Sequence, residues 1–387
     1  METQKLYEEN AYQRTFRARV LSCETGKGGW TVVLDRTAFY PEGGGQPGDQ
    51  GVLDRVNVLD TREKSGQVLH CTDAPLPVGG QVTGGINWTL RRRHMQEHTG
   101  EHILSGVLHR FFGVHNVGFH MGSACVTLDL DKPLTPRQIA LGERLANEAV
   151  WRDLPVSVSY PDESHLRALD YRSKKELSGR VRIVTVPGYD VCACCGTHVA
   201  HTGEIGMIKV LDSIHYKGGV RISMLCGDRA LADYSRKVAA VAAVSGRLSA
   251  KPEAVADAVE RLLAEKEGLQ QQLAAAQGRL FAALADAASP MPNGWICAFA
   301  EDLSPDALRR FALCLAEKAS AGAAAFSGQA GAFHYAIAAA SGDLRTLCRE
   351  MNAAFQGRGG GKPGLVQGSV QAGRTALETW FAHRGEA

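Results

Sequence analysis

HTGEH at residues 98–102 and CCGTH at residues 194–198 are the two stretches that indicate most about this chain, because together they offer the ligands of one metal site. Residues four apart lie on the same face of a helix, so the two histidines of the first stretch can direct their imidazoles at one point. The second stretch offers a cysteine and a histidine that are also four apart, with a glycine between them. Neutral imidazole and thiolate are ligands that zinc prefers. The two stretches together therefore predict one zinc site with room for a water or a substrate oxygen.

Neighbouring residues leave alternatives open for this site. Cys192 and Cys195 form a C-x2-C pair, as in half of a zinc ribbon, but the sequence has no second pair of this spacing. His94 continues the histidine stripe, and the arginines at 91–93 favour a solvated or nucleic-acid-facing role for it. His201 is a further spare ligand.

The bulk properties exclude several classes of protein. A chain of 387 residues is expected to form two or three domains, and a formal net charge of +2 confines any nucleic-acid surface to local patches. No apolar run is long enough to span a membrane, and the first residues, METQKLYEENAYQRTF, lack the apolar core of a signal peptide. Ten cysteines, three of them crowded into residues 192–195, suit reduced thiols and metal binding in a cytoplasmic protein.

The distribution of residue types predicts a mixed α+β chain in four parts. Short β-like runs and Gly/Pro turns predict a small β-barrel or meander over 1–90. Residues 91–230 are expected to form the zinc-containing domain, opened by a helix from about 90 to 112. A long helix or coiled coil is expected over 231–289, and a C-terminal α/β domain over 290–387.

The third part contains a seam that steps by alternating four and three residues and is apolar except at the charged Lys266. Such a heptad seam is typical of a dimerising coiled coil, although a single long helix packed on its own chain would give the same pattern. The residues of the seam are Val255, Val259, Leu262, Lys266, Leu269, Leu273, Ala276, Leu280 and Ala283.

Two glycine-rich stretches suggest contact with a ligand. The first is FYPEGGGQPGDQG at residues 39–51. Its three consecutive glycines cost conformational entropy on folding, which contact of the backbone with a ligand would explain. Glu42 and Gln46 of this loop could face a substrate hydroxyl or amine. GRGGGKPG at residues 357–364 fails the phosphate-loop pattern, because Gln356 and Pro363 stand where a glycine and a hydroxyl are required. It could form a cationic surface for RNA phosphates or a flexible loop.

The glycine loop, HTGEH, CCGTH and KGGVRI at residues 217–222 together resemble the editing domain of alanyl-tRNA synthetase, in the same order and with similar spacing. The chain starts directly with the barrel, so it is similar to the free-standing alanyl-tRNA editing proteins of the AlaX type in their long form. The resemblance implies a translation-protein-like β-barrel for residues 1–90, and the last two parts resemble the C-terminal part of the synthetase, a DHH-associated domain.

The resemblance implies one zinc ion per chain, held by His98, His102, Cys194 and His198. It places Gln46 in the amino-acid pocket and suggests Thr31 as a contact for the serine hydroxyl, with Glu42 as a further catalytic candidate. It implies tRNA(Ala) mischarged with Ser or Gly as substrate, a homodimer through the coiled coil and C-terminal domain, and ATP binding only as a property of the wider family. Candidate tRNA contacts are Arg92, Arg93, Lys217, Arg221, Arg358 and Lys362.

The implied reaction is hydrolysis of the ester between serine and the terminal adenosine of tRNA(Ala). A pocket sized for alanine excludes serine poorly, whereas a second site that hydrogen-bonds the serine hydroxyl penalises alanine by leaving polar groups unpaired. The alternative is an RNA-binding module whose zinc is purely structural, because four protein ligands can close the coordination shell. A zinc peptidase is disfavoured, since the H-E-x-x-H pattern is absent.

Overall fold

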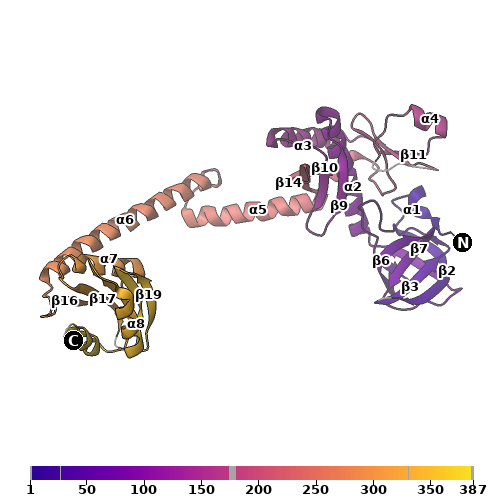
Figure 1. Cartoon of the computed structure of the whole chain (residues 1–387). Helices are drawn as coiled ribbons and strands as arrows, with labels where there is room; N and C mark the ends of the chain where they lie inside the picture. The colour runs from indigo at the N-terminus through magenta and orange to yellow at the C-terminus, as the bar shows by residue number, and fades with distance from the viewer. Residues whose placement is uncertain (1, 27, 174–179, 330, 385–387) are drawn as a thin grey trace. The chain divides into compact units, whose positions relative to one another are not determined.

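The computed structural model describes residues 2–26, 28–173, 180–329 and 331–384. The chain divides into two compact units, residues 1–241 and 242–387, and each has its own sheets and core (Figure 1). Helices and strands are mixed in both units, so the predicted α+β class is confirmed. Among the described helices, none is both long enough and apolar enough to cross a membrane.

Six strands near the N-terminus form a closed barrel. Its core consists of apolar side chains such as Phe16, Ala18 and Val20, which alternate along β2 with exposed polar residues. The short elements β1 (Gln4–Lys5), α1 (Leu6–Glu9) and β4 (Arg36–Thr37) lie beside it, and the glycine loop connects β4 to β5. In sheet order the strands are β2 (Thr15–Gly26), β3 (Gly29–Leu34), β7 (Gln67–Thr72), β6 (Val56–Lys64), β5 (Gly51–Leu53) and β8 (Gln81–Ile86).

Helix α2 (Trp88–Phe112) is the central element of the first unit. Asn87 caps its start by accepting from the backbone N–H of Leu90, and Gly113 ends it in the left-handed conformation at φ 62°. The helix predicted from about residue 90 is confirmed and begins two residues earlier. All of its residues from 94 to 108 are buried, so this part of the helix is covered on all sides and not only on one face.

Two antiparallel sheets and helix α3 (Pro136–Trp151) surround α2. The larger sheet has the order β14 (Ile208–Tyr216), β15 (Gly219–Cys226), β10 (Val126–Leu130) and β9 (Asn116–Met121). The smaller has the order β11 (Ser157–Ser159), β12 (Ile183–Val186) and β13 (Asp190–Ala193). The connections contain α4 (Glu163–Ala168) and the 3-10 turn η1 (Thr202–Ile205).

Two helices, not one continuous helix, cover the stretch 231–289 that was predicted as a long helix or coiled coil. Helix α5 (Gly227–Leu248) ends before Ser249, whose φ is 49°, and α6 (Val255–Ala287) follows the 3-10 turn η2 (Pro252–Ala254). Proline lacks the N–H of a helix interior and disfavours helical conformation at the residue before it, which explains the break. The heptad seam lies along α6 alone, and its leucines are more than half exposed, for example Leu269 at 58% and Leu273 at 59%.

A five-stranded sheet covered on both faces makes up most of the second unit. Its order is β16 (Trp295–Ala300), β17 (Gly322–Gln329), β18 (Ala332–Ala338), β20 (Leu365–Val370) and β19 (Arg358–Lys362). Helices α8 (Leu344–Ala354) and α9 (Arg374–Ala382) pack on one face, and α6 with α7 (Pro305–Ala316) on the other. The glycine-rich stretch forms edge strand β19, paired with β20, so it is neither a phosphate loop nor a flexible loop.

Candidate metal centre

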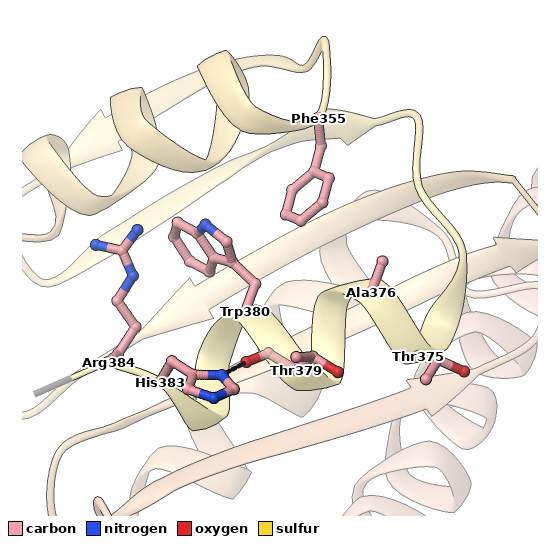
Figure 2. Close-up of a pocket in the computed structure, with 7 residues that line it drawn as sticks. All are labelled: Phe355, Thr375, Ala376, Thr379, Trp380, His383 and Arg384. Carbon is pink, nitrogen blue, oxygen red and sulfur yellow. Dashed lines mark hydrogen bonds between the residues drawn. The ribbon is translucent and has the colours of Figure 1, made fainter. Parts of the chain in front are cut away.

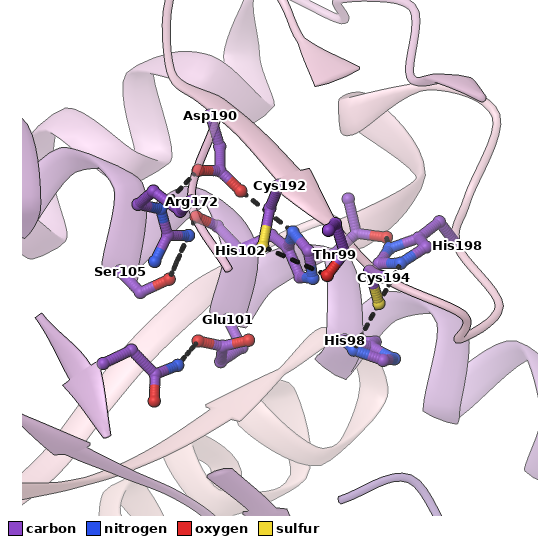
Figure 3. Close-up of polar contacts among 12 residues, drawn as sticks. His98, Thr99, Glu101, His102, Ser105, Arg172, Asp190, Cys192, Cys194 and His198 are labelled. Atoms are coloured by element: carbon purple, nitrogen blue, oxygen red, sulfur yellow. Dashed lines mark hydrogen bonds and ion pairs between the residues drawn. The ribbon is translucent and has the colours of Figure 1, made fainter. Parts of the chain in front are cut away.

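Four side chains from two distant segments meet beside α2 (Figure 3). His98 and His102 project from neighbouring turns of α2, and Cys194 and His198 follow β13. The ligand atoms of all four lie within 4.8 Å of one another. The sulfur of Cys194 is 3.4 Å from Nε2 of His98 and 3.4 Å from Nε2 of His198. A thiolate among three imidazoles is a donor set that suits zinc.

Each of the three imidazoles has an outer hydrogen-bond partner at Nδ1. His98 is paired with Oε1 of Gln46 at 2.9 Å, and His102 is paired with Oδ2 of Asp190 at 2.9 Å. An amide oxygen and a carboxylate can only accept, so both rings carry their proton on Nδ1. Nε2 of each ring is thereby left as the lone-pair donor.

The third ring follows the same rule. Nδ1 of His198 lies 3.1 Å from the hydroxyl of Thr99, which donates its own proton to the carbonyl of Met95 at 2.8 Å. The hydroxyl oxygen therefore accepts from His198. Outer partners that fix the tautomer in this way are typical of metal-binding histidines, so the residues present fit a zinc ion.

Close contacts hold the segments around the four donors in place. A Cβ on Gly196 would lie 2.1 Å from Cε1 of His98, so a side chain at this position would displace the ring. Gly45 has φ +88°, and a Cβ there would lie 2.4 Å from the carbonyl oxygen of Phe119. Arg182 holds the CCGTH turn by donating to the carbonyls of Cys194 at 2.7 Å and Gly196 at 2.9 Å.

Comparison with known proteins relates this chain to proteins that act on or charge tRNA(Ala) by name. Residues 181–223 match the family described as "Threonyl and Alanyl tRNA synthetase second additional domain", and residues 7–90 match "tRNA synthetases class II (A)". The alanyl-tRNA editing protein Aarsd1 of Mus musculus is 31% identical over 275 residues, which is 66% of this chain and 67% of that protein. The Rattus norvegicus protein of the same name is 32% identical over the same shares. This chain belongs to the alanyl-tRNA editing protein family.

The synthetases are related to the same region. Alanine–tRNA ligase of Pyrobaculum calidifontis is 36% identical over 291 residues, which is 70% of this chain but only 32% of the ligase. The chain thus spans about a third of the length of this ligase. The solved C-Ala domain of Aquifex aeolicus alanyl-tRNA synthetase aligns with 24% of this chain and 92% of that domain, at 17% identity and a TM-score of 0.21, too low to support an argument about the fold.

The electrostatics of this editing-family centre favour a thiolate. Burial opposes ionisation of Cys194, but positive charge on the adjoining histidines, when they are protonated in the absence of a metal, outweighs it and holds the pKa of the thiol well below its usual value. Burial likewise opposes ionisation of Asp190, and the contacts with His102 and Arg172 overcome it, so the pKa of that carboxyl is lowered. Nε of Arg172 lies 2.7 Å from Oδ1 of Asp190.

The alternative ligands are placed differently. Cys195 is exposed, whereas Cys192 is buried and forms a second group of close donors with His102 and Asp190. The solvated role expected for His94 is wrong, because its side chain is only 6% exposed and burial lowers its pKa to about 4. Other elements cover the helix around Arg91 and His94, whereas Arg92 of the same run is exposed.

The three residues expected to act on the substrate lie in different surroundings. Gln46 is fully buried behind His98, and its amide nitrogen donates to the hydroxyl of Thr197 at 2.9 Å. Thr31 lies on β3, paired with strands β2 and β7 of the barrel. Glu42 is exposed in the glycine loop, and its backbone N–H donates to the carbonyl of Thr61 at 2.8 Å.

The candidate tRNA contacts fall into two groups. Arg93 is paired with Asp228 at 2.9 Å, and Arg221 makes two bonds to Asp129 at 2.6 and 2.7 Å. The others are exposed: Arg92 at the start of α2, Lys217 in the β14–β15 turn, and Arg358 and Lys362 on β19.

A cavity of about 300 Å³ adjoins the metal centre. It reaches His102 and Cys192, and its polar lining includes Asn116, Tyr171 and Arg172. A wider pocket of about 670 Å³ lies in the second unit, where the guanidinium of Arg384 stacks 3.7 Å from the ring centre of Trp380 (Figure 2). Its lining offers no group of metal ligands, so the smaller cavity is the one that matters for chemistry at the centre.

Sequence reasoning missed the outer partners Asp190 and Thr99 and the supporting arginines 172 and 182. Thr99 directly follows a proposed ligand, and Asp190 precedes the cysteine cluster, but no spacing rule distinguishes them from ordinary polar residues. Their role is visible only once the two segments meet.

Proposed function

We propose that this chain is a trans-editing deacylase that hydrolyses the ester joining serine, or glycine, to the terminal adenosine of tRNA(Ala). The observation that carries the proposal is the convergence of His98, His102, Cys194 and His198 in a member of the alanyl-tRNA editing protein family. The relatives named alanyl-tRNA editing protein supply the substrate class.

The four residues would hold one zinc ion. When bound, zinc supplies Lewis-acid chemistry that polarises a water or a substrate oxygen. The chain's own contribution is to keep the donors in place before substrate arrives. Gln46, Asp190 and Thr99 fix the three rings, and Arg182 fixes the turn that carries Cys194.

The cavity beside His102 is our candidate for the amino-acid and ribose site. Its polar lining can hydrogen-bond a serine hydroxyl, while an alanyl ester would leave those groups unpaired at a cost of about 1–3 kcal/mol. Thr31 and Glu42 remain candidates for further contacts. Gly100 does not widen this cavity, because a Cβ there would meet the sulfur of Cys226 at 2.4 Å.

Contacts with tRNA are proposed for the exposed cations of each unit. In the first unit Arg92 and Lys217 are exposed, whereas Arg93 and Arg221 would have to exchange an aspartate for a phosphate. In the second unit Arg358 and Lys362 point to the same face of β19, because side chains four apart along a strand share a face. Their charges suit the RNA backbone.

A homodimer is proposed through α6 and the C-terminal unit. Leu262, Leu269 and Leu273 of the heptad seam are 51%, 58% and 59% exposed, and a second copy of the helix would cover them.

The deciding experiment is deacylation of tRNA(Ala) charged with Ser, Gly or Ala by sub-stoichiometric protein, with and without chelator. We expect chelator-sensitive release of Ser with Ala spared, and loss of both zinc and activity in His102→Ala. His201→Ala is the matched control, because His201 is an exposed histidine outside the donor set. Full activity of a metal-free His102→Ala protein would refute the zinc centre as the site of reaction.

One observation favours a second function, an RNA-binding module with structural zinc. The donor set already has four protein ligands, the number that closes a tetrahedral structural site. Such a module would retain charged tRNA without releasing amino acid, so the same assay separates the two functions.

A further inference from the structure

The outer partner of His102 differs in charge from the other two. Gln46 offers His98 a neutral amide and Thr99 offers His198 a neutral hydroxyl, whereas Asp190 offers a carboxylate. The Asp190 side chain is 1% exposed, and Figure 3 shows it between His102 and Arg172. Charge-assisted hydrogen bonds are roughly twice as strong as neutral ones, so this contact has the largest influence on its ring.

A closed circuit of hydrogen bonds holds the carboxylate in place. Oδ2 of Asp190 accepts from His102 at 2.9 Å, while Oδ1 accepts from Nε of Arg172 at 2.7 Å. Arg172 also donates to the hydroxyl of Ser105 at 2.8 Å, and that hydroxyl donates to the carbonyl of His102 at 3.3 Å. Each carboxylate oxygen thus has its own partner, and the chain of hydrogen bonds starts at the ring of His102 and ends at the backbone carbonyl of the same residue.

We infer that Asp190, clamped by Arg172, is the positioning residue that orients His102 and strengthens it as a metal ligand. This inference rests on the proposed metal centre. A carboxylate at Nδ1–H draws the proton toward itself and increases the electron density at Nε2, and outer partners of this kind typically contribute 10- to 100-fold to metal affinity.

The test is Asp190→Asn in the full-length chain, which keeps the shape and one acceptor oxygen but removes the charge. Zinc affinity is measured by competition with a chromophoric chelator, and the expected result is an affinity about 10- to 100-fold weaker than that of the wild type. Asp131→Asn is the matched control. Asp131 also holds a histidine, with Oδ2 3.0 Å from Nδ1 of His115, but that ring is outside the donor set, so zinc affinity should not change.

Arg172→Lys provides a second variant in case Asp190→Asn does not fold, and it should weaken zinc binding by a smaller factor. The visible spectrum of the cobalt-loaded protein checks that coordination is retained in each variant. A clearly different cobalt spectrum in Asp190→Asn would make Asp190 a ligand and overturn the inference.

The remaining outcomes are also decisive. Equal zinc affinity in the wild type, Asp190→Asn and Asp131→Asn would overturn the inference and leave the metal centre intact. A lower melting temperature of the metal-free variant with unchanged zinc affinity would overturn it too, since Asp190 would then act only on the fold. A wild-type chain without stoichiometric zinc would refute the metal centre itself, and this result is distinguishable from the others.

Discussion

Arg91 is a fully buried cation that joins the glycine loop to the first turn of α2, and its replacement by methionine should be severely destabilising. Its Nε lies 3.0 and 2.9 Å from the two oxygens of Asp49, which is 1% exposed. Its terminal nitrogens donate to the carbonyls of Ala11 at 2.9 Å and Ala38 at 2.6 Å, and to Asp49. Asp49 in turn accepts from the backbone N–H of Tyr40 at 2.7 Å.

The magnitude follows from the state of Asp49 without its partner. Burial raises the pKa of Asp49 and Arg91 opposes that rise, so in Arg91→Met the carboxyl should take up a proton on folding. Protonating an aspartate of ordinary pKa about 3.9 at pH 7 costs about 4 kcal/mol. This agrees with the roughly 3–5 kcal/mol lost when one partner of a buried ion pair is removed.

The proton uptake also fixes the sign of the pH dependence. Above the ordinary aspartate pKa, folded Arg91→Met binds one more proton than its unfolded state, so its stability relative to the wild type falls by about 1.4 kcal/mol for each pH unit of increase. Comparing Arg91→Met with the wild type cancels the protons of the metal centre, which both proteins share.

The assay is urea unfolding of the zinc-free full-length chain at about pH 6 and about pH 8, read by hydrogen exchange in peptides from α2. The difference between variant and wild type should grow by about 3 kcal/mol between these conditions. Adding Asp49→Asn to Arg91→Met should abolish this growth. A loss below about 1 kcal/mol, or one independent of pH, would refute the reasoning.

Three further predictions concern the site, the tail and the barrel. Gly196→Ala should weaken zinc binding about tenfold or more, because the new Cβ would lie 2.1 Å from Cε1 of His98; unchanged chelator competition would contradict this. Arg358→Ala with Lys362→Ala should make the log–log salt dependence of tRNA binding shallower by about 1.5 to 2, and an unchanged slope would place the RNA elsewhere. His70 is fully buried, with its pKa lowered to about 4 by burial. Above about pH 6.5, His70 is neutral in both the folded and the unfolded state. Between about pH 6.5 and 4 only the unfolded state is protonated, so up to about 3 kcal/mol of stability should be lost as the pH falls. In urea titrations, His70→Gln should reduce this dependence of the unfolding free energy on pH, and an unchanged dependence would contradict the prediction.

Elements with a strong local signal were predictable from the sequence. The helix that carries His98 and His102 was predictable because its spacing and its terminal Gly113 are local features. The break at Pro252 was missed although proline marks such breaks locally, because residues 231–289 were assigned as one helical part, whereas the heptad seam itself begins only after the proline, at Val255. Of the two alternatives for the stretch 358–362, the flexible loop is wrong: three consecutive glycines have low intrinsic strand propensity, but pairing with β20 decides the conformation.

The burial of charged and polar residues was not predictable in the same way. An arginine run before a histidine normally indicates a solvated helix face. Arg91 and His94 are nevertheless buried, because the glycine loop beside the barrel and the surrounding sheets cover this helix from several directions. Only the packing of segments remote in sequence decides which face of such a helix meets water.

The sequence by itself determined the donor types and their spacing, because residues four apart within a helix or a tight turn are held together locally. The tertiary structure alone decided how those donors are supported. Gln46, Asp190 and Thr99 reach their histidines across 52, 88 and 99 residues of chain. Contacts at such separations depend on how the barrel, α2 and β13 pack against one another. Local propensity does not predict that packing, because it depends only on residues that are neighbours in sequence.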